Sequence, residues 1–130
     1  MTENIERPAN YQPPQSAEDL LLRYSEGERY FAELELDDAT YDFQNVILEG
    51  ADFSRSFITA DFRGAKLKRA AFRSANIKTC DFRNADLAGA DFSGALLEGT
   101  EFEGANLQGA RFEGASCFSY TMKENERPWW

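Results

Sequence analysis

The sequence of 130 residues contains no histidine and only two cysteines. Histidine is the usual general base near neutral pH and the commonest metal ligand, so its absence removes the most frequent kinds of catalytic and metal site. The two cysteines lie far apart and form no metal-binding pair. Serine is abundant, but no base is available to activate its hydroxyl as a nucleophile. We therefore predict a protein that is not an enzyme and has no catalytic residue, no cofactor and no metal ligand.

Long apolar runs are also missing, and the N-terminus has no signal-peptide pattern. A membrane span needs about 20 consecutive apolar residues, so we predict no contact with a membrane and a cytoplasmic location. Cys80 and Cys117 both fall on positions that the repeat described below turns inward. Buried free thiols behave as small hydrophobic groups, which fits a reducing compartment. A disulfide between the two cysteines is the alternative.

What the sequence does contain is a repeat of five residues. From Phe43 to Phe112 an apolar residue recurs at nearly every fifth position, and phenylalanine alternates with leucine or isoleucine. A period of five matches neither an α-helix, with about 3.6 residues per turn, nor a flat strand, with a period of about 2. The predicted structural core consists of Phe43, Leu48, Phe53, Ile58, Phe62, Leu67, Phe72, Ile77, Phe82, Leu87, Phe92, Leu97, Phe102, Leu107 and Phe112.

A small residue, most often alanine, stands two positions before each of these central residues, as Ala85 does before Leu87. Each five-residue unit thus has two inward and three outward positions. This pattern predicts a very short strand followed by a corner, where glycine tolerates the turn. Stacked coils would pair their backbones about 4.8 Å apart. Because Phe alternates with an aliphatic residue, Phe lies over Phe in successive coils only if each coil holds an even number of units. This favours four units per coil.

The register breaks once, with a shortened step between Ile58 and Phe62. We place the missing residue near Thr59, because an earlier break would turn Arg55 into the core, where an unpaired charge is costly. This choice leaves Phe57 pointing outward, which is unusual for the pattern.

The tandem pattern of Ala, then Asp or Asn, then Leu or Phe resembles the pentapeptide repeat family. The pattern is clear at Ala85–Leu87, Ala90–Phe92 and Ala105–Leu107, and the repeats extend over 41–119. The resemblance implies an all-β fold, namely a right-handed quadrilateral β-helix with four pentapeptides per coil and about four coils. Right-handed connections are also the general preference in proteins.

Three shorter segments flank the predicted β-helix. Residues 1–15 contain three prolines and few large apolar residues, so we predict a flexible N-terminal arm. Residues 16–40 are predicted to form a short capping α-helix and a lead-in, since Ser16 is suited to begin a helix, Gly27 to end it, and a solenoid needs its open end covered. Residues 120–130 are a C-terminal tail.

Several apolar residues are predicted to lie outside the core, near one face of the rod and its C-terminal end: Phe57, Leu96, Phe118, Trp129 and Trp130. Exposed apolar patches usually mark an interface, so these residues are a candidate protein-binding surface. The tail can either fold over the last coil or contact a second copy. We favour a monomer with a self-capping tail, because this covers the open edge without a partner. A homodimer through the C-terminal end is the alternative.

The net charge of −9 is unevenly distributed along the sequence. Residues 61–85 hold seven basic and two acidic residues, whereas the segments on both sides are acidic. This basic belt consists of Arg63, Lys66, Lys68, Arg69, Arg73, Lys78 and Arg83. One interpretation is contact with nucleic acid or another anion. Outward positions must be polar, however, and the belt is spread over several faces, so we predict no nucleic-acid partner.

Coils of four units would also align four carboxylates in an acidic column: Asp42, Asp61, Asp81 and Glu101. The column resembles those through which some pentapeptide repeat proteins are thought to imitate the phosphates of DNA and occupy type II topoisomerases such as gyrase. Arg63 and Arg83 flank the column and are expected to pair with it. We therefore predict a non-enzymatic protein-protein interaction or scaffold module, with a DNA-mimicking, gyrase-binding protein as the alternative.

Overall fold

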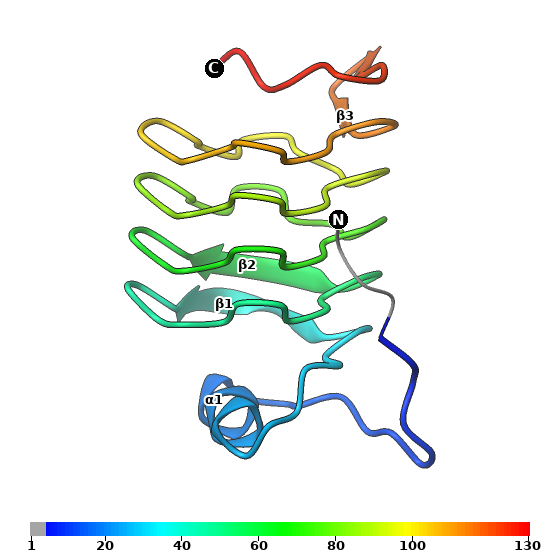
Figure 1. Cartoon of the computed structure of the whole chain (residues 1–130), viewed down its shortest axis with the longest axis vertical. Coiled ribbons are helices and arrows are strands. Elements are labelled where there is room, and N and C mark those ends of the chain that lie inside the picture. Colours follow the sequence, from blue (N-terminus) through cyan, green and yellow to red (C-terminus); the bar gives the residue numbers. More distant parts are fainter. Residues whose placement is uncertain (1–4) are drawn as a thin grey trace.

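A computed structural model describes residues 5–130 as a stack of coils wound about one axis (Figure 1). Within these residues the regular elements are α1 (Ala17–Ser25), β1 (Glu35–Asp42), β2 (Phe57–Asp61), β3 (Ser116–Cys117) and β4 (Tyr120–Thr121). Helix α1 lies beyond one end of the stack, and the C-terminal tail crosses the other end (Figure 1). Most sides of the coils are so short that they meet through single backbone bridges.

Parallel bridges join each coil to the next at every five-residue unit. Later bridges, such as Asp81–Glu101, connect positions that are four complete units apart, so each coil has four sides. The bridges that begin at Ile47, Asp52 and Phe57 fall one position short of four units because they span the break in the repeat. Backbone hydrogen bonds run from coil to coil, for example from Phe82 N to Glu101 O over 2.8 Å. These bonds take the place of a conventional sheet ladder.

The break in the repeat lies where the sequence predicts it. The bridge from Phe57 to Asn76 is one position short of four units, whereas the bridge from Asp61 to Asp81 spans four complete units. The missing residue therefore falls between Phe57 and Asp61. The Phe57 side chain is 50% exposed and that of Ile58 is buried, so the prediction of an outward Phe57 is confirmed.

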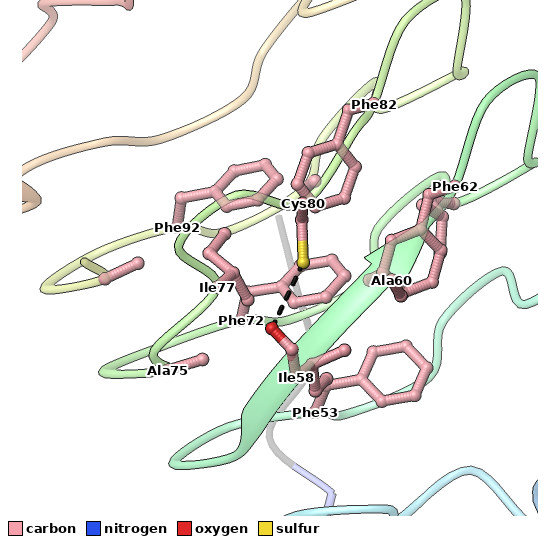
Figure 2. Packing of buried hydrophobic residues seen from close by; sticks show 14 of the residues in the cluster. Phe53, Ile58, Ala60, Phe62, Phe72, Ala75, Ile77, Cys80, Phe82 and Phe92 are labelled. Atoms are coloured by element: carbon pink, nitrogen blue, oxygen red, sulfur yellow. Dashed lines mark hydrogen bonds between the residues drawn. The ribbon is translucent and has the colours of Figure 1, made fainter. Parts of the chain in front are cut away.

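Phenylalanines stack in two columns inside the coils (Figure 2). The rings of Phe62 and Phe82 are parallel with centroids 5.2 Å apart, and those of Phe72 and Phe92 are 5.0 Å apart. Between the columns the rings meet edge to face, as Phe82 and Phe92 do at 5.6 Å. Both arrangements are favourable for aromatic quadrupoles. The structure buries every central residue from Phe43 to Phe112 except Leu107, which is partly exposed in the last coil.

Cys80 occupies one of the small inward positions between these columns (Figure 2). Its Sγ donates a hydrogen bond of 3.2 Å to Ile58 O, and burial raises the pKa of the thiol to about 12. Cys117 is only partly buried, because no further coil covers it. Both cysteines are free, so the structure contains no disulfide between them and Cys80 remains a protonated, unreactive core residue.

The corners of most units have a left-handed backbone conformation. Gly64 and Gly104 have φ of +68° and +74°, and the Asn beneath each, Asn45 and Asn84, has φ of +60° and +61°. Gly and Asn tolerate this conformation better than other residues. Thr79, with φ of +63°, is a β-branched residue in the same position and is strained there.

The coil register begins earlier than the sequence indicates. Tyr30 bridges to Asp52, and the start of β1 pairs with the start of β2, so that Phe31 and Leu36 already occupy two sides of a coil. The rest of β1 pairs out of this register, because 37–40 bulge opposite Thr59. Residues 30–40, predicted as part of the lead-in, therefore include three buried residues of the main core, Phe31, Leu34 and Leu36.

Helix α1 begins as its sequence predicts. The Ser16 hydroxyl accepts a hydrogen bond of 3.0 Å from Asp19 N, which satisfies one of the free amides of the first turn. Leu20 is fully buried in the main core, and the Tyr24 hydroxyl donates to Glu49 O over 2.8 Å. These contacts hold the helix against the first coils.

The segment before α1 also contacts the solenoid. The Tyr11 hydroxyl donates a hydrogen bond of 2.8 Å to Ala32 O, and the Tyr11 ring packs edge to face on Tyr30. Of the predicted flexible arm, residues 1–4 lie outside the described residues. The flexibility of 1–15 stays a prediction, although Tyr11 fixes one point of this segment.

At the other end the chain turns back on itself through β3 and β4. Met122 is buried and exchanges backbone hydrogen bonds with Gly114 (2.9 Å) and Ala115 (2.7 Å). The Trp130 indole N–H donates to Thr100 O over 2.8 Å. Among the described residues, the backbone N–H groups of Phe102, Leu107 and Phe112 in the last coil have no hydrogen-bond partner. The tail thus covers this edge only in part.

Candidate interaction surfaces

The four residues of the acidic column lie in register along one side of the stack. Asp42 pairs with Asp61, Asp61 with Asp81, and Asp81 with Glu101. In Asp61 and Asp81 the carboxylate also accepts a hydrogen bond of 3.0 Å from the backbone N–H two residues on. This local bond explains why Asp suits the position. Coil stacking thus brings the four carboxylates together.

Two arginines neutralise part of this column. Arg63 and Arg83 each bind the Asp two residues before them at 2.7 Å, with two guanidinium nitrogens contacting one carboxylate. Arg83 Nε also lies 3.0 Å from Glu101 Oε2, and Arg63 Nε lies 3.7 Å from Asp81 Oδ2. Alternating charges therefore run from Asp61 to Glu101, and this part of the side does not present a continuous acidic surface.

The same pairs shift the acidity of the carboxylates. The hydrogen bond from the Arg63 side chain lowers the pKa of Asp61, and that from the Arg83 side chain lowers the pKa of Asp81. The partner arginines have raised pKa values for the corresponding reason. Both carboxylates therefore stay ionised to a lower pH than isolated Asp side chains.

The basic belt does not form a single surface. Besides Arg63 and Arg83, Arg73 binds Asp91 at 2.7 Å and Lys68 lies 3.7 Å from Asp86. The three other cations, Lys66, Arg69 and Lys78, have no ion pair among the described residues. Lys66 belongs to the side that carries Ile47, whereas Lys78 lines a small hollow beside Phe57 on another side. Lys66 and Lys78 therefore lie on different sides of the rod.

The five predicted interface residues fall into two places. Phe57 shares a column with Asn76 and Leu96, but the polar Asn76 stands between them and Leu96 is partly buried. Phe118, Trp129 and Trp130 meet at the C-terminal end, where they line one hollow. The structure thus brings three of the five residues together and leaves Phe57 and Leu96 apart from them.

This C-terminal surface is the largest exposed aromatic group of the described residues. Phe118 is 81% exposed and Trp129 is 68% exposed. Tyr120, which the sequence analysis did not include, packs edge to face on Trp129 at 5.2 Å, and Trp129 packs on Trp130 at 5.1 Å. We call Phe118, Tyr120, Trp129 and Trp130 the aromatic end. Tyr120 could have been included among the predicted interface residues because it is aromatic and lies two positions after Phe118.

The aromatic end borders an open hollow of about 490 Å³. Besides Phe118 and the two tryptophans, it is lined by Gly99, Thr100, Glu101 and Cys117. The Phe118 N–H donates a hydrogen bond of 3.2 Å to Glu98 Oε2. The hollow is therefore lined by three aromatic residues and one acidic residue, Glu101, and the Glu98 carboxylate binds the backbone of Phe118.

Metal binding and membrane insertion have no matching feature in residues 5–130. The described residues contain no cluster of three or more Cys, Asp or Glu side chains placed to bind a metal ion. None of the helices in this part of the chain is long and apolar enough to cross a membrane.

Comparison with known proteins gives one family match. A family model described as pentapeptide repeats matches residues 42–78 and 80–116, in eight copies. These segments make up more than half of the chain. No curated protein gives a significant match.

Solved structures add relatives of several kinds. A pentapeptide repeat protein from Nostoc Pcc 7120, alr5209, is 36% identical over 90% of this chain and 93% of its own, with a TM-score of 0.41. A pentapeptide repeat protein from the Arabidopsis thaliana thylakoid lumen is 37% identical over 62% of this chain and 68% of its own, with a TM-score of 0.42. QnrB1, a plasmid-mediated fluoroquinolone resistance protein, is 22% identical over 65% of this chain, with a TM-score of 0.52. The match covers 56% of QnrB1, and the likeness is one of fold.

Proposed function

The chain belongs to the pentapeptide repeat family, and from this premise we propose that it is a non-enzymatic module that binds another protein. Members of the family form right-handed quadrilateral β-helices, which fits the four-sided coils described above. The stacked phenylalanines fill the interior of the coils, so recognition has to take place on the outer surface. We place it at the aromatic end.

The exposure of the aromatic end is the observation that carries this proposal. Phe118 and Trp129 hold large apolar surfaces in water, next to Tyr120 and Trp130. Soluble proteins rarely expose such groups together without a binding role, and Trp and Tyr contribute most strongly to protein interfaces. The proposed module thus binds its partner with the C-terminal end of the rod and keeps the coils as a rigid support.

A comparison of tagged variants tests this proposal. Trp129→Ser combined with Phe118→Ser removes the exposed aromatic surface, while Leu22→Ser removes a similarly exposed apolar residue (57%) from α1 at the opposite end. We expect the wild type and the Leu22 variant to retain the same partner from an extract of the native cells, and the double variant to lose it. The partner is then purified, and binding is measured by calorimetry. Equal retention by all three proteins would contradict the proposal.

The acidic column supports a second candidate, a DNA mimic that binds gyrase. Its four carboxylates are aligned along the rod, as the phosphates of DNA are aligned along a strand. Arg63 and Arg83 occupy the same side and pair with three of the four. A mimic needs uncompensated negative charge, and for this reason we rank this candidate second.

A gyrase assay distinguishes the two candidates. We expect the purified protein to leave DNA supercoiling by gyrase unchanged at low micromolar concentration, because the arginines interrupt the acidic surface. The matched variant is Asp81→Lys, which should be equally inactive. Inhibition by the wild type that disappears in Asp81→Lys would overturn the first proposal and establish the mimic.

The proposal also includes the oligomeric state and the cellular location of the protein. We propose a monomer in the cytoplasm, with the tail folded over the last coil through Met122 and Trp130. A homodimer through the C-terminal end is the competing arrangement. Light scattering of the purified protein separates the two states.

A further inference from the structure

We propose that the hollow at the aromatic end accepts an arginine side chain of the partner protein, stacked on the tryptophans and paired with Glu101. This inference rests on the proposed protein-binding function and names the chemistry that the surface recognises.

The aromatic walls are suited to a flat cation. Trp129 and Trp130 stand at 89° to each other, so the hollow is bordered by rings in two orientations. The Trp130 ring is held in place because its indole N–H donates to Thr100 O. A guanidinium group stacks on such ring faces and is attracted by their electron density. A fixed ring also loses little conformational entropy on binding.

The charge at the edge selects a cation over an apolar group. Glu101 lines the hollow, and its Oε2 lies 3.0 Å from Arg83 Nε. Glu98 also lies beside Phe118. An apolar ligand would remove water from these carboxylates without replacing its hydrogen bonds, which is unfavourable. The cations of the tail, Lys123 and Arg127, do not line the hollow.

Arginine fits these features better than lysine. Its planar guanidinium can stack on Trp129 while its N–H groups reach a carboxylate oxygen, and lysine offers only a compact point charge. A carboxylate has about four acceptor positions, so Glu101 can accept further hydrogen bonds beside its contact with Arg83. The partner is therefore expected to present an exposed arginine in the segment that meets the aromatic end.

Peptide binding tests the inference directly. The probe is a fluorescein-labelled tri-arginine peptide with blocked ends, and the control probe replaces each arginine with citrulline, which has the same shape but no charge. We expect anisotropy at about 0.15 M salt to show at least about tenfold tighter binding of the arginine peptide. Tryptophan emission should change as well, because both tryptophans of the chain lie at this hollow.

Variants of the full-length protein locate the binding. Trp129→Leu removes an exposed ring, and Glu101→Gln removes the charge. Each variant should bind the arginine peptide about fivefold more weakly than the wild type does. Leu22→Ala, on α1, should bind as the wild type does. Melting temperatures show whether each variant is folded, and Trp129 is exposed enough for its replacement to leave the core intact.

Several results would overturn the inference. Equal binding of the citrulline peptide, equal binding by Trp129→Leu and Leu22→Ala, or equally tight binding of tri-lysine or tri-proline peptides would each exclude guanidinium recognition at the hollow. If the arginine peptide fails but a purified partner still depends on Phe118 and Trp129, the proposed function stands and only this inference is wrong. If no partner depends on these residues, the proposed function fails, whatever the peptides show.

Discussion

Small residues decide how closely the phenylalanine columns approach one another. Ala90 is fully buried in the same core as Phe82 and Phe92, whose rings already meet edge to face at 5.6 Å. Interiors packed to this density have no room for added carbon atoms. Residue size at the inward positions therefore matters as much as hydrophobicity does.

Replacing Ala90 with leucine tests this packing. We expect Ala90→Leu to lower the free energy of unfolding by about 1–3 kcal/mol or more, because the larger side chain has to displace the phenylalanine rings. The measurement is thermal unfolding by circular dichroism. Ala88→Leu, at an outward position of the same coil, is the control and should change stability little. An unchanged melting temperature in Ala90→Leu would show that Ala90 does not belong to the core.

At the corner that contains Thr79, a substitution is expected to stabilise the protein. Thr79 has φ of +63° beneath Gly99, and Asn occupies the same place beneath Gly64 and Gly104. Asn adopts this conformation with less strain than a β-branched residue. We expect Thr79→Asn to raise stability by about 0.5–1 kcal/mol, measured by urea unfolding. A fall in the urea midpoint would contradict this account of the corners.

At the scale of elements, the acidic column and its arginines form one alternating ladder along a side of the stack. The order is Asp61, Arg63, Asp81, Arg83 and Glu101, with neighbouring charges bonded within a coil or between coils. The pKa of Asp81 is lowered chiefly by the hydrogen bond from Arg83. A carboxylate with a lowered pKa in the folded state stabilises the fold above its unfolded pKa, and this stabilisation is lost as pH falls through the folded value.

Removal of Arg83 should therefore weaken the protein at acid pH. In Arg83→Met the pKa of Asp81 returns toward its ordinary value, so we expect acid unfolding to begin at a higher pH than in the wild type. The shift should be small, because the pair is partly exposed and solvent screens it. Arg111→Met, which removes a cation without an ion pair among the described residues, is the control. Identical acid midpoints for Arg83→Met and the wild type would show that the ladder adds no stability.

The elements that obey the five-residue period could be predicted from sequence, and the others could not. The period identified the central residues and the outward position of Phe57. It also predicted that Arg63 lies beside Asp61 on one side of the rod, because stacking repeats the same geometry at each coil. It missed Phe31 and Leu36, since the bulge at 37–40 shifts them out of register with Phe43. It also could not place Trp130 over Thr100, because the tail has no repeat and depends on tertiary contacts.

For the whole molecule, the two ends of the stack differ in how they are covered. Helix α1 buries Leu20 against the N-terminal coils, whereas the C-terminal coil is covered by a tail that pairs with Gly114, Ala115 and Thr100. Each coil contacts only its neighbours, so an uncovered end exposes core residues and backbone edges directly to water.

Removal of the tail tests this covering. We expect a protein lacking residues 119–130 to melt at a lower temperature at every concentration and to aggregate, since Met122 no longer shields the last coil. Differential scanning fluorimetry and light scattering provide the measurements. If the wild type is instead a dimer and the truncated protein is a stable monomer, the tail is an interface and not a cover.

The four-sided register also limits how such a chain can lengthen during evolution. An insertion of one five-residue unit would rotate everything after it by a quarter turn and set phenylalanine above leucine. Two units would restore the aromatic columns but place the Asp61–Asp81 side over a different set of charges. Only a duplication of four units, one whole coil, preserves both the interior columns and the ladder outside. Gene duplications that lengthen this rod should therefore be retained in whole coils, each adding about 4.8 Å.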